Sequence, residues 1–172
     1  MAIELDPGHL MEKIEQTAMS ALGGSQLNDL WNNSFGSITK RVKQVFGDLG
    51  KSLGYQIAAS GYPGADDGEW LYDMVWYVVG PAGMYLRQAM VLESEPHLRT
   101  NDSDDHFLKL VQARANVRVW FTAVQNHEQH IANCKRQASV FSNGALGDAY
   151  LFVVWDSAMR RAFIEQFHVG WP

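Results

Sequence analysis

Residues 84–124 constrain the fold of this chain more than any other stretch, because they combine a strand pattern, a helix pattern and a second strand pattern in succession. The first part (84–95) and the last part (117–124, VRVWFTAV) are largely apolar runs of strand length, and the segment between them has helical spacing. A helix between two buried strands is the usual connection for parallel pairing. We therefore expect an α/β domain in which both strands belong to one sheet.

The same patterns define the remaining elements and predict the order ααβββαβαββ. Three strands between residues 55 and 95 are expected to form a meander, and each later helix to cross between parallel strands. We expect an N-terminal helical extension (1–26) followed by one α/β domain (27–172), a mixed sheet flanked by helices. The expected helices are 8–22, 27–53 with a break near Gly36 or Gly47, Asp102 or Ser103 to 115, and 127–141; the other strands are 55–59, 69–79, 149–156 and an edge strand at 162–169.

Composition narrows the class of protein. The N-terminal residues lack the basic start and apolar run of a signal peptide, and no window approaches the ~18 apolar residues of a membrane span, so we expect a soluble, cytoplasmic protein. The single cysteine, Cys134, excludes an internal disulfide and is expected to be structural. A net charge of -5 counts against tight nucleic-acid binding, although four cations share one expected helix and are interpreted as its solvated face: Lys40, Arg41, Lys43 and Lys51.

Three carboxylates stand out in the strand patterns. Asp73 alternates with apolar residues in 69–79, and Glu93 and Glu95 end the next strand on one side. Carboxylate oxygens suit Mg²⁺ or Mn²⁺, so Asp73 and Glu93 are candidate ligands of one divalent ion. The alternative is that these acids are solvated strand ends or pair with basic groups such as Arg87.

The order of these features resembles the PD-(D/E)XK nuclease superfamily, the restriction-endonuclease-like fold. A helix, a meander with an acid in its second strand and Glu-x-Glu at the end of its third, a helix and a buried strand follow one another over residues 38–124. More narrowly, LESEP, FLKL and QARANVRVWF are similar to bacterial nuclease-fold proteins with ESEW, DFxKL and a strand rich in Val and Ile.

The resemblance implies a metal-dependent hydrolysis of phosphodiester bonds, with DNA as the expected partner. Asp73 and Glu93 take the places of the two metal-binding acids, whereas Glu95 occupies the position that is usually a lysine. Some members carry that lysine on the following helix, which nominates Lys109. Helical geometry instead places Lys109 on the exposed side, where it can pair with Asp105.

Other candidates are weaker. His127 and His130 form HEQH, one residue short of HExxH, and are interpreted as a helix surface. His97 alternates with the two glutamates, but the preceding proline leaves its direction open. Eight aromatics in the expected strands are interpreted as core rather than as base-stacking residues: Trp70, Tyr72, Trp76, Tyr77, Trp120, Phe121, Phe152 and Trp155.

Two hypotheses therefore remain. One is a Mg²⁺- or Mn²⁺-dependent endonuclease in which Asp73 and Glu93 bind the metal, Glu95 is a ligand or base and Lys109 assists. The other is a degenerate nuclease fold that serves as a binding or regulatory module, as the displaced lysine and the acidic charge favour. The apolar stripe of the first helix is expected to pack on its own domain or to mediate a homodimer.

Overall fold

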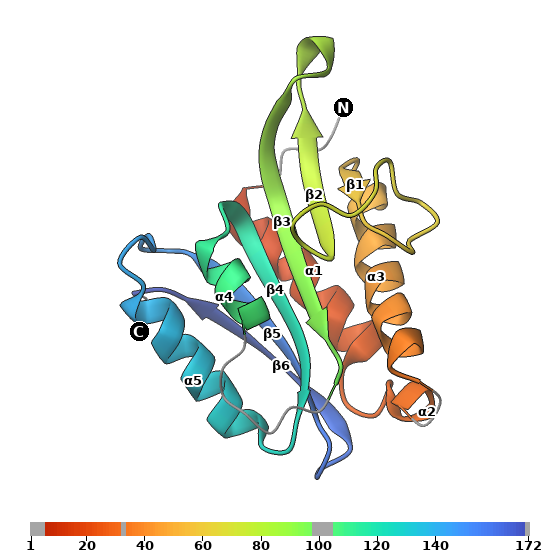
Figure 1. The fold of residues 1–172 in the computed structure, drawn as a ribbon, viewed down its shortest axis with the longest axis vertical. Helices are drawn as coiled ribbons and strands as arrows, with labels where there is room; N and C mark the ends of the chain where they lie inside the picture. The colour runs from red at the N-terminus through yellow and green to blue at the C-terminus, as the bar shows by residue number, and fades with distance from the viewer. Residues whose placement is uncertain (1–5, 32–33, 98–104, 171–172) are drawn as a thin grey trace.

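The computed structural model describes residues 6–31, 34–97 and 105–170 (Figure 1). Asp102 and Ser103, the expected helix caps, lie outside these ranges. The helices are α1 (Pro7–Leu22), α2 (Asn28–Trp31), α3 (Phe35–Ser52), α4 (Asp105–Gln112) and α5 (His127–Val140), with a short 3₁₀ turn at Pro81–Gly83; the strands are β1 (Gln56–Ala58), β2 (Met74–Val79), β3 (Tyr85–Glu95), β4 (Ala115–Val124), β5 (Ala149–Asp156) and β6 (Arg161–His168).

The described strands form one six-stranded mixed sheet whose spatial order equals their chain order, β1-β2-β3-β4-β5-β6. The first three strands make the expected antiparallel meander. Helices α4 and α5 then connect β3, β4 and β5 in parallel, and β6 closes the sheet as an antiparallel edge strand. The predicted α/β class, meander and crossovers are confirmed.

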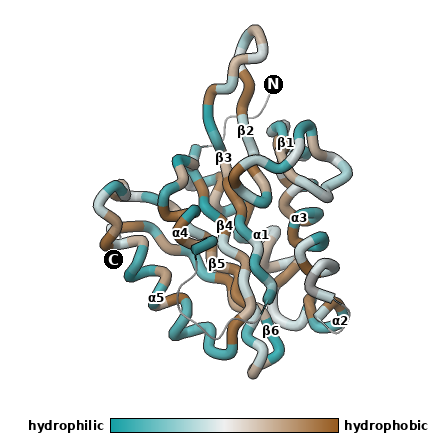
Figure 2. The backbone as a smooth tube through the Cα atoms, viewed as in Figure 1, coloured by the Kyte–Doolittle hydropathy of each residue, from teal (hydrophilic) through white to brown (hydrophobic). Residues whose placement is uncertain are grey.

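Helices cover both faces of the sheet and bury two hydrophobic layers. Helices α1 and α3 pack on one face, and α4 and α5 on the other (Figure 1). The tube of α5 alternates between hydrophilic and hydrophobic stretches, as expected for a helix with one covered side (Figure 2). No described helix is long and apolar enough to cross a membrane.

Helix α1 belongs to this core. Its apolar stripe, with Leu10, Ile14 and Leu22, is fully buried, and the helix contacts α3, β4, β5 and β6. Asp6 caps its start by accepting hydrogen bonds from the backbone N–H groups of Gly8 and His9. Of the four apolar residues on which the dimer prediction rests, Leu10, Ile14 and Leu22 are therefore already covered within the chain, whereas Met19 is 59% exposed.

The long helix expected at 27–53 is two helices. Ser34 begins α3 by accepting a hydrogen bond from the Ser37 N–H at 3.2 Å, which places the break just before Gly36. The helix runs straight through Gly47, where an added Cβ would come within 2.5 Å of the Tyr62 ring. Gly47 thus permits a close ring contact instead of ending the helix.

The second strand is shorter than the pattern predicts. β2 begins at Met74, so residues 69–73 precede the strand in an irregular segment. This correction changes the environment of Asp73, which stands at the entrance of the strand and is half-buried.

Candidate functional site

Asp73 and Glu93 lie next to each other on adjacent segments. β2 pairs with β3 in an antiparallel register that sets Met74 opposite Leu92. Asp73, which precedes Met74, therefore lies beside Glu93, which follows Leu92. The Ser94 N–H donates a hydrogen bond to Asp73 Oδ2 at 2.7 Å. The aspartate is therefore anchored to β3 beside Glu93, as the sequence predicts.

Glu93 is more deeply buried than Asp73, with only 2% of its surface exposed. Two side chains of α4 contact it: His106 Nδ1 lies 3.2 Å from Oε2, and Lys109 Nζ lies 3.5 Å from Oε1. Oε1 accepts no hydrogen bond from the described residues. Glu93 thus keeps one buried oxygen with coordinating capacity that the surrounding protein does not fully use.

The surroundings raise the pKa of Glu93. Burial is the largest cause, because it disfavours the charged carboxylate, and the neighbouring Asp73 charge raises the pKa further. His106 and Lys109 act in the opposite direction. Two carboxylates, a lysine and a histidine therefore interact at this site, and a cation added there would favour the ionised form of Glu93.

Lys109 contacts the acid site, which corrects the prediction of a solvated lysine paired with Asp105. Helix α4 buries Phe107, Leu110 and Val111 against the sheet. Lys109 occupies a position on the outer side of α4, as its spacing predicts, and its side chain is 39% exposed. Its flexible stem nevertheless carries Nζ back to Glu93, which angular position on the helix alone does not reveal.

Glu95 lies at the rim of the site and contacts two histidines. His97 Nδ1 is 2.7 Å from Oε1, and His106 Nε2 is 3.6 Å from Oε2. His106 therefore bridges the two glutamates through its two ring nitrogens. Sequence reasoning missed His106, although its spacing of three from Lys109 places both residues on neighbouring parts of one helix surface.

Lys43 is the second residue that sequence reasoning missed. It was assigned to a solvated face, yet it is only 6% exposed. Its Nζ lies 3.1 Å from Glu69 Oε2 and 3.5 Å from Asp73 Oδ1, and donates to the Ser60 carbonyl at 3.2 Å. The available signal was its position next to Val42 and three residues before Phe46, on the buried side of α3.

The donor set fits a hard divalent cation with few protein ligands. No three His, Cys, Asp or Glu side chains of the described ranges form a metal-binding group. Mg²⁺, however, commonly takes one or two carboxylates and keeps several waters or phosphate oxygens. Asp73 and the incompletely bonded Glu93 Oε1 are compatible with that mode.

His127 and His130, the histidines of the HEQH segment, make contacts away from the acid site. His127 Nδ1 lies 2.8 Å from Asp156 Oδ2, and the Trp120 indole N–H donates to His130 Nε2 at 3.0 Å. Cys134 is buried, and its Sγ lies 3.4 Å from the same His130 nitrogen. These contacts tie α5 to β4 and β5, although the residues are less solvated than the sequence predicted.

Most of the aromatic residues expected in the core are buried, but the prediction is wrong for Trp70. It precedes β2 and is 39% exposed, with its ring packed against Tyr77 and Tyr85. The short β2 explains the difference, because residue 70 lies in the irregular segment and not in a covered strand.

Comparisons with known proteins identify no relative. No protein-family model, no curated protein and no solved structure matches this chain.

Proposed function

We propose that this protein is a metal-dependent nuclease of restriction-endonuclease-like architecture that cleaves phosphodiester bonds, with DNA as the first substrate to test. One observation carries the proposal: Lys109 Nζ lies 3.5 Å from the buried Glu93 carboxylate, which adjoins Asp73. Two acids at the ends of adjacent strands and a lysine from α4 form a set suited to phosphoryl chemistry.

The order of elements supports the architecture. Helix α3, the meander β1-β2-β3, helix α4 and strand β4 follow one another, as the resemblance implies. Asp73 stands just before β2 and Glu93 near the end of β3, and these two strands are paired. Lys109 comes from the helix after the meander, the alternative position that the resemblance allows.

Each residue then has a distinct role. Asp73 and Glu93 would hold Mg²⁺ or Mn²⁺, which when bound supplies an activated water and stabilises charge on the phosphate. Lys109 places a positive charge beside the reacting phosphate and orients the attacking water. Glu95 holds His106 through their 3.6 Å contact, and His106 in turn holds Glu93.

The test compares metal binding and cleavage in matched variants. Mn²⁺ is titrated calorimetrically into the wild type and into Asp73→Asn and Lys109→Met, and each protein is then incubated with plasmid DNA, single-stranded DNA and RNA. Glu12→Gln and Lys13→Met serve as controls, because both residues are exposed on α1, on the opposite face of the sheet.

We expect Asp73→Asn to lose both Mn²⁺ binding and cleavage. Lys109→Met should keep the metal and lose cleavage by roughly 10²-fold or more, the size of effect seen when one charge-stabilising group is removed. The controls should match the wild type. Cleavage that survives Asp73→Asn would remove this site from the reaction.

A second candidate function is a non-cutting binding module, and Lys43 is the observation that favours it. Its buried ammonium already forms ion pairs with Asp73 and Glu69, as an internal substitute for a metal ion. In that case Lys43→Met should increase Mn²⁺ affinity, because it removes a competing cation, and should create no cleavage. A wild type that binds Mn²⁺ and cuts none of the three substrates would also support the binding module.

A further inference from the structure

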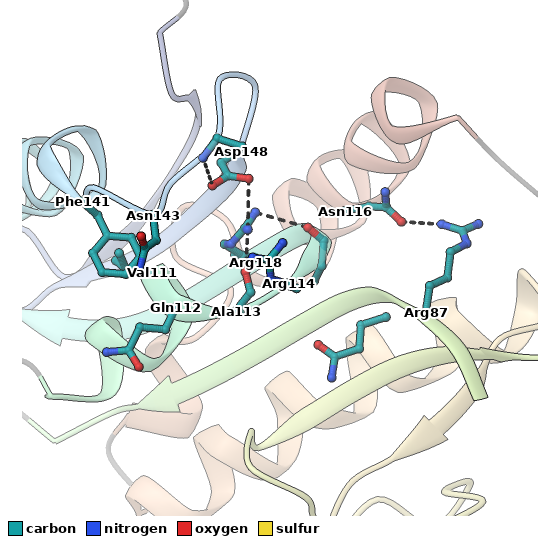
Figure 3. Close-up of a pocket in the computed structure, with 13 residues that line it drawn as sticks. Arg87, Val111, Gln112, Ala113, Arg114, Asn116, Arg118, Phe141, Asn143 and Asp148 are labelled. Atoms are coloured by element: carbon teal, nitrogen blue, oxygen red, sulfur yellow. Dashed lines mark hydrogen bonds and ion pairs between the residues drawn. The ribbon is translucent and has the colours of Figure 1, made fainter. Parts of the chain in front are cut away.

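A polar pocket of about 720 Å³ lies away from the acid site, at the other end of β3 and β4 (Figure 3). Its lining comes from the start of β3, the segment that joins α4 to β4, and the loop before β5. The volume is within the ~300–1,000 Å³ of typical small-ligand sites. The pocket is therefore large enough to hold a small molecule.

The pocket concentrates positive charge in a chain whose net charge is -5. Three arginines line it, Arg87, Arg114 and Arg118, against a single carboxylate, Asp148. Arg114 is exposed and forms no ion pair with any described residue. Guanidinium groups match the geometry of phosphate and carboxylate oxygens, so this surface suits an anion.

Arg118 gives the pocket a fixed floor. It is 4% exposed, and its Nη2 donates to the Ala113 carbonyl at 2.6 Å and to Asp148 Oδ1 at 3.1 Å (Figure 3). Its guanidinium also lies over the Tyr150 ring. Its Nε–H has no acceptor among the described residues. A buried arginine whose hydrogen-bonding capacity exceeds what the protein supplies is a second, independent sign of an anion site.

An aromatic surface adjoins this basic pocket. A neighbouring pocket of about 500 Å³ shares Arg87 and Arg114 and is lined by Trp70 and Tyr85. The two rings lie 5.6 Å apart, and both are exposed to solvent. Tyr85 and Arg87 are two residues apart on β3, about 7 Å along a strand. A flat ring and an anionic group of one ligand can therefore be bound together.

We propose that the joined pockets bind a nucleotide, with its phosphate at Arg114 and Arg118 and its base on Trp70 and Tyr85. Arginine forks recognise the phosphate, and aromatic faces stack on a base with little regard to its identity. Amide side chains at the pocket, Gln112 and Asn143, add donors and acceptors for the sugar and base (Figure 3). The ligand is either a free nucleotide or one unit of a single strand.

This site is separate from the proposed metal site, although Tyr72, which lines the second pocket, is influenced by charges of both sites. Burial raises the pKa of the Tyr72 hydroxyl, the Glu93 carboxylate raises it further, and Arg118 lowers it. The nucleotide proposal does not depend on cleavage. All binding experiments therefore contain EDTA, so that failure of the nuclease proposal leaves their outcome unaffected.

The experiment is calorimetric titration with three probes: adenosine 5′-monophosphate, inorganic phosphate and adenosine. We expect adenosine 5′-monophosphate to bind more tightly than either inorganic phosphate or adenosine alone. Arg114→Ala should weaken nucleotide binding at least about tenfold, because a charge-assisted hydrogen bond is lost. Arg41→Ala, an exposed arginine on α3 across the sheet, should leave binding unchanged.

Aromatic variants test the other half of the site. Trp70→Ala and, as a second variant, Tyr85→Ala should weaken binding of the nucleotide but not of phosphate. A 5′-phosphorylated single-stranded oligonucleotide identifies the source: equal affinity indicates a free nucleotide, and much tighter oligonucleotide binding indicates a strand. Nucleotide binding no tighter than that of phosphate, or equal binding by Arg114→Ala and Arg41→Ala, would overturn the proposal.

Discussion

At the scale of single residues, the molecule places ionised groups where water cannot solvate them. Glu93 and Lys43 have almost no exposed surface, and each is balanced by a group of opposite charge on another element. Such pairs add little net stability, because the cost of taking the charges out of water can exceed the energy of their attraction. These residues are therefore better explained by function than by stability.

Glu93→Gln should stabilise the protein at neutral pH in the presence of EDTA. The folded pKa of Glu93 is raised by burial and by Asp73, so ionised Glu93 costs stability once the pH rises through that folded pKa. The gain should fade as the pH falls through about 4.3, the ordinary glutamate value, because below it wild-type Glu93 is protonated in both the folded and the unfolded state. Urea denaturation across pH 4–8, with Glu12→Gln as the control, measures this; a loss of stability at pH 7 would contradict it.

At the scale of elements, helix α1 is an integral layer of the fold. It lies across β4, β5 and β6, and Gly24, just after the helix, forms a backbone bridge with Ala162 of β6. The sequence indicates an amphipathic helix but not what covers it, because periodicity identifies an apolar face and not its partner.

Ile14→Ala should therefore destabilise the chain by about 2–5 kcal/mol, the usual cost of truncating a buried isoleucine. Met19→Ala on the same helix should change stability by less than about 0.5 kcal/mol, because Met19 is 59% exposed. Chemical denaturation of both variants measures the difference. Equal effects would mean that α1 does not pack on the sheet.

Elements with strong periodicity could be predicted from the sequence, whereas contacts between them could not. The strand 149–156 was predicted to the residue, because every one of its side chains is buried and its run is uninterrupted. The adjacency of Asp73 and Glu93 followed from the meander. Lys43, His106 and the reach of Lys109 did not, because they depend on how helices on opposite faces meet the ends of two strands.

At the scale of the whole molecule, the backbone amides in the middle of the sheet are the best shielded from solvent. β4 and β5 have hydrogen-bonded neighbours on both sides and helices over both faces. β1 has only three residues and stands at one edge. The sheet is therefore expected to open from its β1 edge before its centre.

Native-state hydrogen exchange should show this gradient directly. The slowest amides should lie in 117–123 and 150–154, and those of β1 should exchange at least about tenfold faster, since local opening there disrupts fewer contacts. Mass-spectrometric exchange at constant pH measures both segments. Uniform protection across the sheet would indicate that it opens only as one unit.

The identity between strand order and chain order has a consequence for synthesis on the ribosome. Each strand pairs with the one made immediately before it, so the sheet can grow by one strand at a time as the chain emerges. Helix α1 is the exception, since it is made before every strand of the sheet and yet packs on β4, β5 and β6, the last three of these strands to be made. Its apolar stripe must remain uncovered by these three strands until they have been synthesised, so α1 offers a chaperone an apolar surface on the nascent chain.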